Sequence, residues 1–193
     1  MNSSAEPEVH IFGELLGAAR LGVGDAFCRF RFVQENDGAS EAWRCAEGTL
    51  SGQTQVEQGS RGHVVWNHPV DVHFFARSVA GWPRIDVSVW RLTPEGHQVP
   101  VGYGTCAVPT TNGLHGIQCS LWRPVGSLSD ELSRIFLGFA PSLRKPAAVS
   151  QDLELRQRLK TASAGTVLLR LEVLTRNFPQ HNVEIAEKHT IMM

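Results

Sequence analysis

The feature that most constrains the fold of this chain is an alternation of apolar and polar residues with a period of two. Cys28, Phe30 and Phe32 alternate with Arg29 and Arg31, and the same pattern recurs along the chain. This alternation is typical of β-strands that have one face on a core and the other towards solvent. The other strand candidates lie at 9–16, 42–47, 63–66, 70–76, 85–90, 101–108, 114–121 and 167–173.

Turn signals such as Asn112-Gly113 separate these candidates. About eight short strands, with no helices alternating between them, indicate an all-β fold, an antiparallel β-sandwich. A chain of 193 residues is long enough to bury a core without a disulfide or a metal. We expect a single domain over 8–180, with flexible ends at 1–7 and 182–193, because no linker or internal repeat divides the chain.

One segment has a helical period instead. Leu128, Leu132 and Ile135 recur at the spacing that places apolar residues on one side of a helix. The sequence therefore predicts one inserted helix at 128–137, packed on the sandwich.

Charge and cysteine content limit the partners and the compartment. The 18 basic and 19 acidic residues nearly cancel, so no net field attracts nucleic acid. We expect a cytosolic protein, because the sequence shows no signal peptide and no apolar run long enough to span a bilayer. Cys28, Cys45, Cys106 and Cys119 lack metal-type spacing and are expected to be reduced, with most of them buried.

A search for reactive groups finds no pattern that indicates catalysis. The sequence lacks the glycine-flanked serine, phosphate-loop and zinc-protease motifs. No two Asp residues lie within ten positions of each other, so a calcium site is not expected. His68 and His73 are expected on opposite faces of a strand, which is wrong for sharing a metal. We therefore predict no enzyme activity, no catalytic residues, no metal and no cofactor.

Tryptophan residues supply the first candidate contacts. Trp90 lies on the polar side of its strand, and Trp82 stands before Pro83 at a turn. Tryptophan is enriched in interfaces, because it buries a large area and keeps a polar N–H group. We expect Trp82 and Trp90 to contact a partner or anchor a loop, whereas Trp66 and Trp122 are expected to fill the core.

A basic segment supplies the second set of candidate contacts. It consists of Arg144, Lys145, Arg156, Arg158 and Lys160, with Asp152 and Glu154 between them. Such a patch fits anionic lipid or an acidic partner, although a solvated loop of this composition remains an alternative.

Nine short motifs occur in a fixed order, and one of them is Gly81-Trp82-Pro83-Arg84. They lie at 8–18, 27–28, 52–56, 66–74, 81–84, 102–109, 119–124, 165–167 and 176–178. Together they resemble the B9 domain family of ciliary proteins. The departures from the family pattern are small: a longer loop at 34–42 and an extra tail from about 186.

The resemblance implies a calcium-independent, C2-like β-sandwich. It further implies a non-catalytic scaffold subunit of the Meckel-syndrome, tectonic-like complex of the ciliary transition zone. In such a complex the chain would bind other B9-domain proteins and tectonic-complex membrane proteins, through sheet edges and exposed aromatic residues, and support ciliogenesis and gating. The implied location is cytoplasm at the cilium base, with the basal body and the axoneme cytoskeleton. The alternative is a calcium-independent phospholipid-binding module at a membrane surface.

Overall fold

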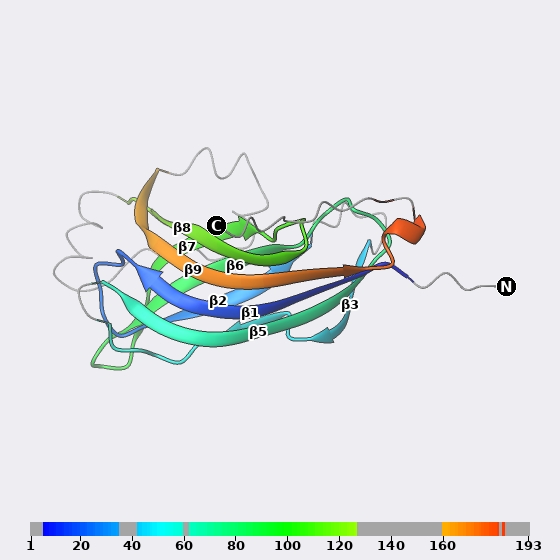
Figure 1. Ribbon diagram of the computed structural model, residues 1–193. Helices are drawn as coiled ribbons and strands as arrows, with labels where there is room; N and C mark the ends of the chain where they lie inside the picture. Colours follow the sequence, from blue (N-terminus) through cyan, green and yellow to red (C-terminus); the bar gives the residue numbers. More distant parts are fainter. Residues whose placement is uncertain (1–5, 35–41, 60–61, 127–159, 182, 184–193) are drawn as a thin grey trace, which may run out of the picture.

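The computed structural model describes residues 6–34, 42–59, 62–126, 160–181 and 183, which form nine strands and one short 3-10 helix (Figure 1). The strands are Glu8–Ala19 (β1), Ala26–Val33 (β2), Trp43–Gly48 (β3), Ser51–Gln53 (β4), Val64–Ala76 (β5), Arg84–Leu92 (β6), Gln98–Ala107 (β7), Gly113–Pro124 (β8) and Thr161–Arg176 (β9). The 3-10 helix Pro179–His181 (η1) follows β9. Nowhere in the described part of the chain is there a helix with the length and apolarity to span a bilayer.

The period-two pattern forms strands for a physical reason that β6 shows well. Ile85, Val87 and Val89 point into the core, and the polar residues Asp86 and Ser88 between them point outward. β-branched side chains pack well on a pleated, half-buried surface, so this order of residues favours a strand.

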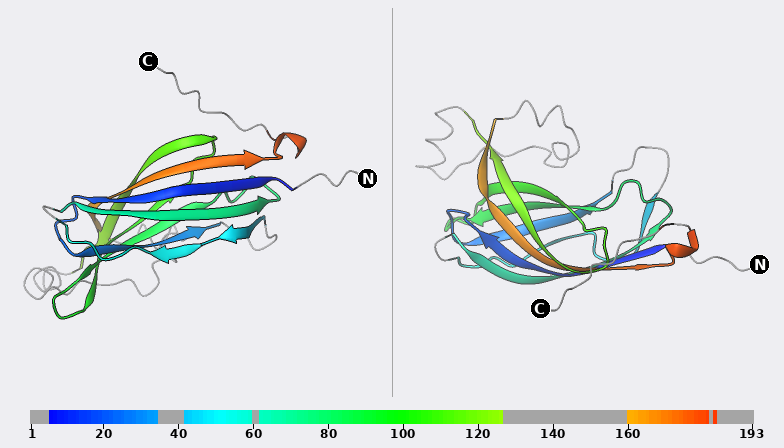
Figure 2. Two further views of the ribbon diagram at one scale, coloured as in Figure 1. Left: turned by 60° about the horizontal axis from the view of Figure 1, so that its bottom comes forward. Right: turned by 45° about the horizontal axis from the view of Figure 1, so that its top comes forward.

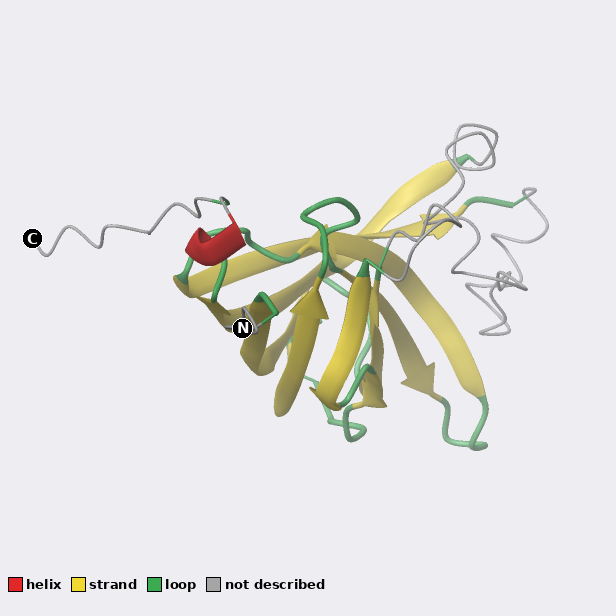
Figure 3. Ribbon diagram, turned by 90° about the vertical axis from the view of Figure 1, so that its right-hand side faces the viewer, coloured by secondary structure: helices red, strands yellow, loops and turns green. Residues whose placement is uncertain are grey.

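All nine strands belong to one antiparallel sheet in the order β3-β5-β1-β9-β8-β7-β6-β2-β4. Between β7 and β8 the pairing is reduced to one residue pair, Tyr103 and Trp122. We call β3-β5-β1-β9-β8 the large limb and β7-β6-β2-β4 the small limb. The two limbs lie over one another with the core between them (Figure 2). The sheet is strongly curled (Figure 3).

β7 and β8 approach each other closely because two glycines face the contact. A Cβ atom on Gly102 would lie 2.7 Å from the Ala164 Cβ, and one on Gly104 would lie 2.8 Å from the Ser120 carbonyl oxygen. Both distances are shorter than van der Waals contact. Residues with side chains would therefore push β7 away from the large limb.

The two edge strands of the sheet are parts of one bent segment. β3 pairs with β5 in the large limb, and β4 pairs with β2 in the small limb. Thr49 and Leu50 connect them: the Thr49 N–H donates to the Asp71 carbonyl (2.9 Å), and the Leu50 carbonyl accepts from the Phe32 N–H (2.7 Å). The chain thus ties the two limbs together on the side opposite the bend at β7 and β8.

Aromatic side chains hold the two limbs together through the core. Phe32 of β2 contacts Phe74 of β5 edge-on, with ring centroids 6.3 Å apart. Trp66 of β5 is 3% exposed, and its Nε1–H donates to the Ala26 carbonyl at the start of β2 (3.0 Å). This confirms the expected core position of Trp66.

An all-β antiparallel fold is confirmed, but two sequence expectations are corrected. The predicted sandwich of about eight strands is one continuous, curled sheet of nine, because a residue pair still joins β7 to β8. The strands expected at 63–66 and 70–76 are one strand, β5, with Pro69 inside it. Pro69 is tolerated because β3 ends opposite Val72, so β1 is the only described neighbour of β5 there. The helix expected at 128–137 lies outside the described residues.

Replacing Trp66 with Ala is expected to lower the free energy of unfolding by about 3–5 kcal/mol, because it leaves a large cavity between the limbs. It also removes the indole donor of the Ala26 carbonyl. Chemical denaturation followed by circular dichroism measures the change. The matched control is Val65→Ala on the neighbouring residue, which is 61% exposed and should change stability by no more than about 0.5 kcal/mol. Equal stability of Trp66→Ala and the parent chain would contradict this packing.

Candidate interaction surface

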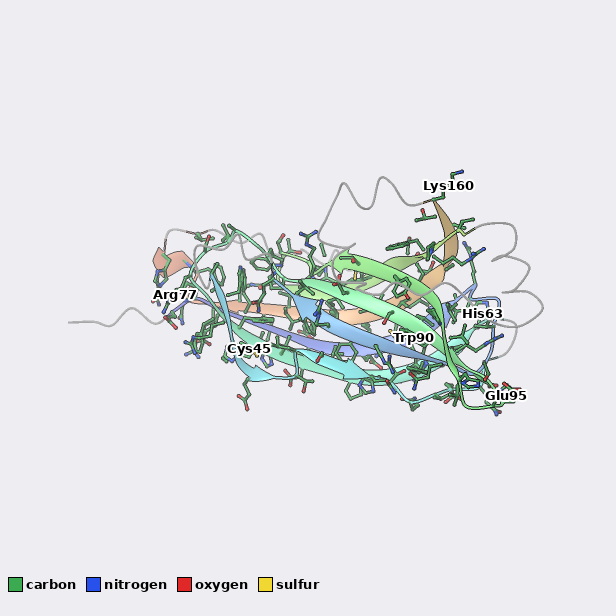
Figure 4. The ribbon with its side chains drawn as sticks, turned by 180° about the vertical axis from the view of Figure 1, so that it is seen from behind. Cys45, His63, Arg77, Trp90, Glu95 and Lys160 are labelled. Carbon is green, nitrogen blue, oxygen red and sulfur yellow. The ribbon has the colours of Figure 1, made fainter. Side chains whose placement is uncertain are left out.

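The outer side of β2, β6 and β7 in the small limb gathers aromatic and basic side chains, and Trp122 of β8 lies at its margin. The strand register places Arg29 of β2 beside Ser88 of β6, and Ser88 beside Tyr103 of β7. Seen from behind, this side faces the viewer, with Trp90 labelled on it (Figure 4). We call it the β2–β6–β7 face and define it by Phe27, Arg29, Arg31, Asp86, Ser88, Trp90, Tyr103, Thr105 and Trp122.

Arg29 is held in place at the centre of this face. Its guanidinium carbon lies 5.0 Å from the ring centroid of Trp90 and 5.3 Å from that of Phe27. The same guanidinium donates to the side-chain oxygens of Gln53 (2.9 Å) and Gln98 (2.7 Å). A cation over an aromatic ring contributes about 0.5–1 kcal/mol at an exposed site. These contacts therefore hold the Arg29 side chain in one orientation although its charge is not buried.

A hollow of about 230 Å³ lies beside this cluster. Tyr103 and Trp122, whose ring centroids are 5.7 Å apart, line one part of it. The row Arg31, Asp86 and Thr105 lines another part. Thr105 Oγ1 donates to Asp86 Oδ1 (2.7 Å), and the Arg31 guanidinium lies 3.7 Å from Asp86 Oδ2. The hollow therefore has aromatic walls on one side and an ion pair on the other.

The outward strand residues of the small limb carry a positive charge. Arg29, Arg31 and Arg84 face outward together with one acidic residue, Asp86. Interfaces are enriched in aromatic residues and Arg, because these bury large areas and make directional hydrogen bonds. The composition of the face fits protein contact better than it fits catalysis.

Trp82 lies at the other end of β6 from Trp90, so the structure does not bring these two predicted contacts together. The Trp82 ring packs edge-on against Trp43 of β3, with centroids 5.0 Å apart. The Trp43 Nε1–H donates to the Ala80 carbonyl (2.8 Å). Trp82 Nε1 is buried and has no hydrogen-bond acceptor among the described residues. In this position Trp82 fastens the loop before β6 to the large limb.

Of the predicted basic segment, the structure describes only Lys160, which is exposed at the start of β9. Its carbonyl accepts from the Val125 N–H (2.8 Å). Arg144, Lys145, Arg156 and Arg158 lie outside the described residues.

The expected separation of His68 and His73 is confirmed. The His68 ring contacts Phe30 on the core side, at 5.7 Å between centroids. The His73 ring is on the outer side, with its Nε2 3.4 Å from Glu8. Within the described ranges, no three His, Cys, Asp or Glu residues are grouped so that they could hold a metal ion.

The cysteines are free, and their environments differ. Cys28 and Cys119 are buried in the core, whereas Cys45 and Cys106 are partly exposed. Burial raises the pKa of the Cys28 thiol far above its ordinary value. A hydrogen bond with the Cys106 thiol, followed by burial, raises the pKa of Cys119.

A family model described as "Ciliary basal body-associated, B9 protein" (B9-C2) matches residues 9–174. The chain belongs to the B9 family. The B9 match includes all nine strands except the ends of β1 and β9, so the β2–β6–β7 face lies entirely within the B9 region.

B9 relatives from several animals match over most of their length. B9 domain-containing protein 2 of Homo sapiens is 38% identical over 178 residues, and that of Danio rerio is 36% identical over 178 residues. Each alignment covers 92% of this chain and 98% of the relative. B9 domain-containing protein 1 of Xenopus laevis is 29% identical over 175 residues, 88% of this chain and 84% of the relative. Among solved structures, a C2 domain of plant Extended Synaptotagmin 1 matches with a TM-score of 0.41 and 13% identity, over 86% of this chain and 92% of that one.

Sequence reasoning missed part of this B9 face. Trp122 was expected in the core, but Cys119 and Leu121 take the inward positions of β8, so Trp122 is half-buried on the outer side. The alternation of Cys119, Ser120, Leu121 and Trp122 contains this signal.

Thiol labelling of the folded protein is expected to distinguish the four cysteines. Because the thiolate is the reactive form, a raised pKa and burial both protect Cys28 and Cys119 near pH 8. Iodoacetamide should therefore modify Cys45 and Cys106 before Cys28 and Cys119, and all four thiols only after unfolding, as measured by peptide mass spectrometry. Labelling of Cys28 in the folded protein at the rate of Cys45 would contradict the described core.

Proposed function

We propose that this chain is a non-catalytic scaffold subunit of the transition-zone complex at the base of the cilium, the Meckel-syndrome or tectonic-like complex. It binds other B9-domain proteins, contacts membrane proteins of the complex, and supports cilium assembly and gating. The family match over residues 9–174 carries this proposal.

The structure supports a role in contact rather than in catalysis. The two limbs are packed on one core and tied at both sides, so the outer faces are ordered before any partner arrives. Preordered surfaces lose little conformational entropy on binding. Arg29 shows this ordering most directly, because two aromatic rings and two Gln side chains hold it.

The sheet edges are poor docking sites, because β3 has six residues, β4 has three, and both belong to one bent segment. Contact through the outer faces is therefore favoured over addition of a strand. Calcium-independent phospholipid binding remains the alternative. It depends on the basic residues 144–158, which lie outside the described residues, together with exposed Lys160.

Purification of the tagged chain from ciliated cells under mild conditions is expected to recover other B9-domain proteins, identified by mass spectrometry. An unrelated tagged β-domain, expressed at the same level, serves as the control. Recovery of no B9-domain protein with the intact chain would contradict the proposed function.

A further inference from the structure

The two outer faces of the molecule carry opposite charge. The outward strand residues of β1, β5 and β9 contain more acidic than basic groups, in contrast to the β2–β6–β7 face. This large-limb side lies towards the viewer in Figure 1. We call it the acidic face, and its charged residues on β1, β5 and β9 are Glu8, Glu14, Asp71 and Glu172 with Arg170 and Arg176, beside His10 and His73. The edge strand β3 adds one residue of each sign, Arg44 and Glu47.

The acidic face also exposes aliphatic side chains. Leu114 of β8 is 56% exposed and Leu174 of β9 is 45% exposed. The register places Leu114 directly beside Glu172, and Leu174 two residues further along β9. An apolar centre with charged neighbours is the usual anatomy of a protein interface. The B9 fold can therefore present an acidic face with aliphatic side chains standing out of it.

The β2–β6–β7 face has the complementary properties. Its outward Arg residues match an acidic surface in charge, and the aromatic rings of Tyr103 and Trp122 in the hollow offer an apolar contact to an aliphatic side chain. Arg31 is 49% exposed although it lies near Asp86, so its guanidinium can reach a partner carboxylate. Complementary charge fixes the orientation of docking and excludes surfaces of like charge.

We propose that the β2–β6–β7 face of this chain docks on the acidic face of a second B9-fold domain. An aliphatic side chain of that domain enters the hollow beside Tyr103 and Trp122, and its carboxylates pair with Arg31 and Arg29. The inference rests on the proposed function, because it names the surface through which another B9-domain protein is bound.

The dimensions of the face allow such a contact. Three strands about 4.8 Å apart, each followed for about eight residues, project an area of about 380 Å². Side-chain relief increases the accessible area, and interfaces at the lower end of the stable range bury about 600 Å² on each partner. With its side-chain relief, the face approaches the size of the smallest specific domain–domain contacts.

The experiment compares two charge reversals with matched surroundings. Arg31→Glu changes the β2–β6–β7 face, and Arg170→Glu changes the acidic face. The Arg31 side chain is 49% exposed and the Arg170 side chain is 54% exposed. Each forms an ion pair with a carboxylate on the neighbouring strand. Tagged chains are expressed at equal level in ciliated cells, and the co-purified B9-domain proteins are quantified. Arg31→Glu should reduce recovery at least about tenfold, whereas Arg170→Glu should retain it.

A second variant tests the hollow without changing charge. Ser88 lines the hollow, so Ser88→Phe places a ring where the partner side chain would lie. It should also reduce recovery at least about tenfold. Thermal unfolding of each variant shows whether it is folded. If Arg31→Glu is not folded, Ser88→Phe decides the test.

The outcomes separate this inference from the proposed function. If the parent chain recovers B9-domain proteins and both small-limb variants recover them equally well, the inference is wrong and the scaffold function stands. Loss with Arg170→Glu alone would assign docking to the opposite face. A third arm uses vesicles of phosphatidylcholine and phosphatidylserine. If Arg31→Glu abolishes flotation but leaves B9 recovery unchanged, the face binds lipid and the inference is overturned.

Discussion

The single residue pair Tyr103–Trp122, where β7 meets β8, is the constraint on which the rest of this structure depends. On the inner side of the bend, the two limbs face each other and enclose one core. On the outer side, the same two rings line the hollow of the β2–β6–β7 face. Gly104 belongs to the same arrangement, because a side chain there would separate β7 from β8. The contact between β7 and β8 therefore shapes both the core and the candidate docking surface.

Most strands could be predicted from the sequence, because alternation along a strand is a local signal. The burial of Trp66 was also expected, as core packing by a large apolar side chain. The single curled sheet could not be predicted, because strand order depends on contacts between distant residues, such as the Thr49 N–H with the Asp71 carbonyl. Pro69 shows the same limit, since its place inside β5 is decided by where β3 ends.

The candidate site was only partly visible in the sequence. Trp90 was correctly placed on the polar side of its strand, and Arg29 was visible as an outward residue. The contact between Arg29 and Trp90 could not be predicted, because it depends on the pairing of β2 with β6. Trp122 was misplaced, although its own strand carries the signal. The B9 family is described as ciliary basal body-associated, and the geometry adds one candidate contact face.

The bent segment that joins β3 to β4 has a further consequence for association between molecules. A sheet with long open margins recruits strands from neighbouring molecules and is prone to aggregate. Here the margins are short and consecutive in the chain, and each is hydrogen-bonded to its limb. β3 and β4 therefore offer few backbone groups to a strand of another molecule, which limits edge-to-edge association there.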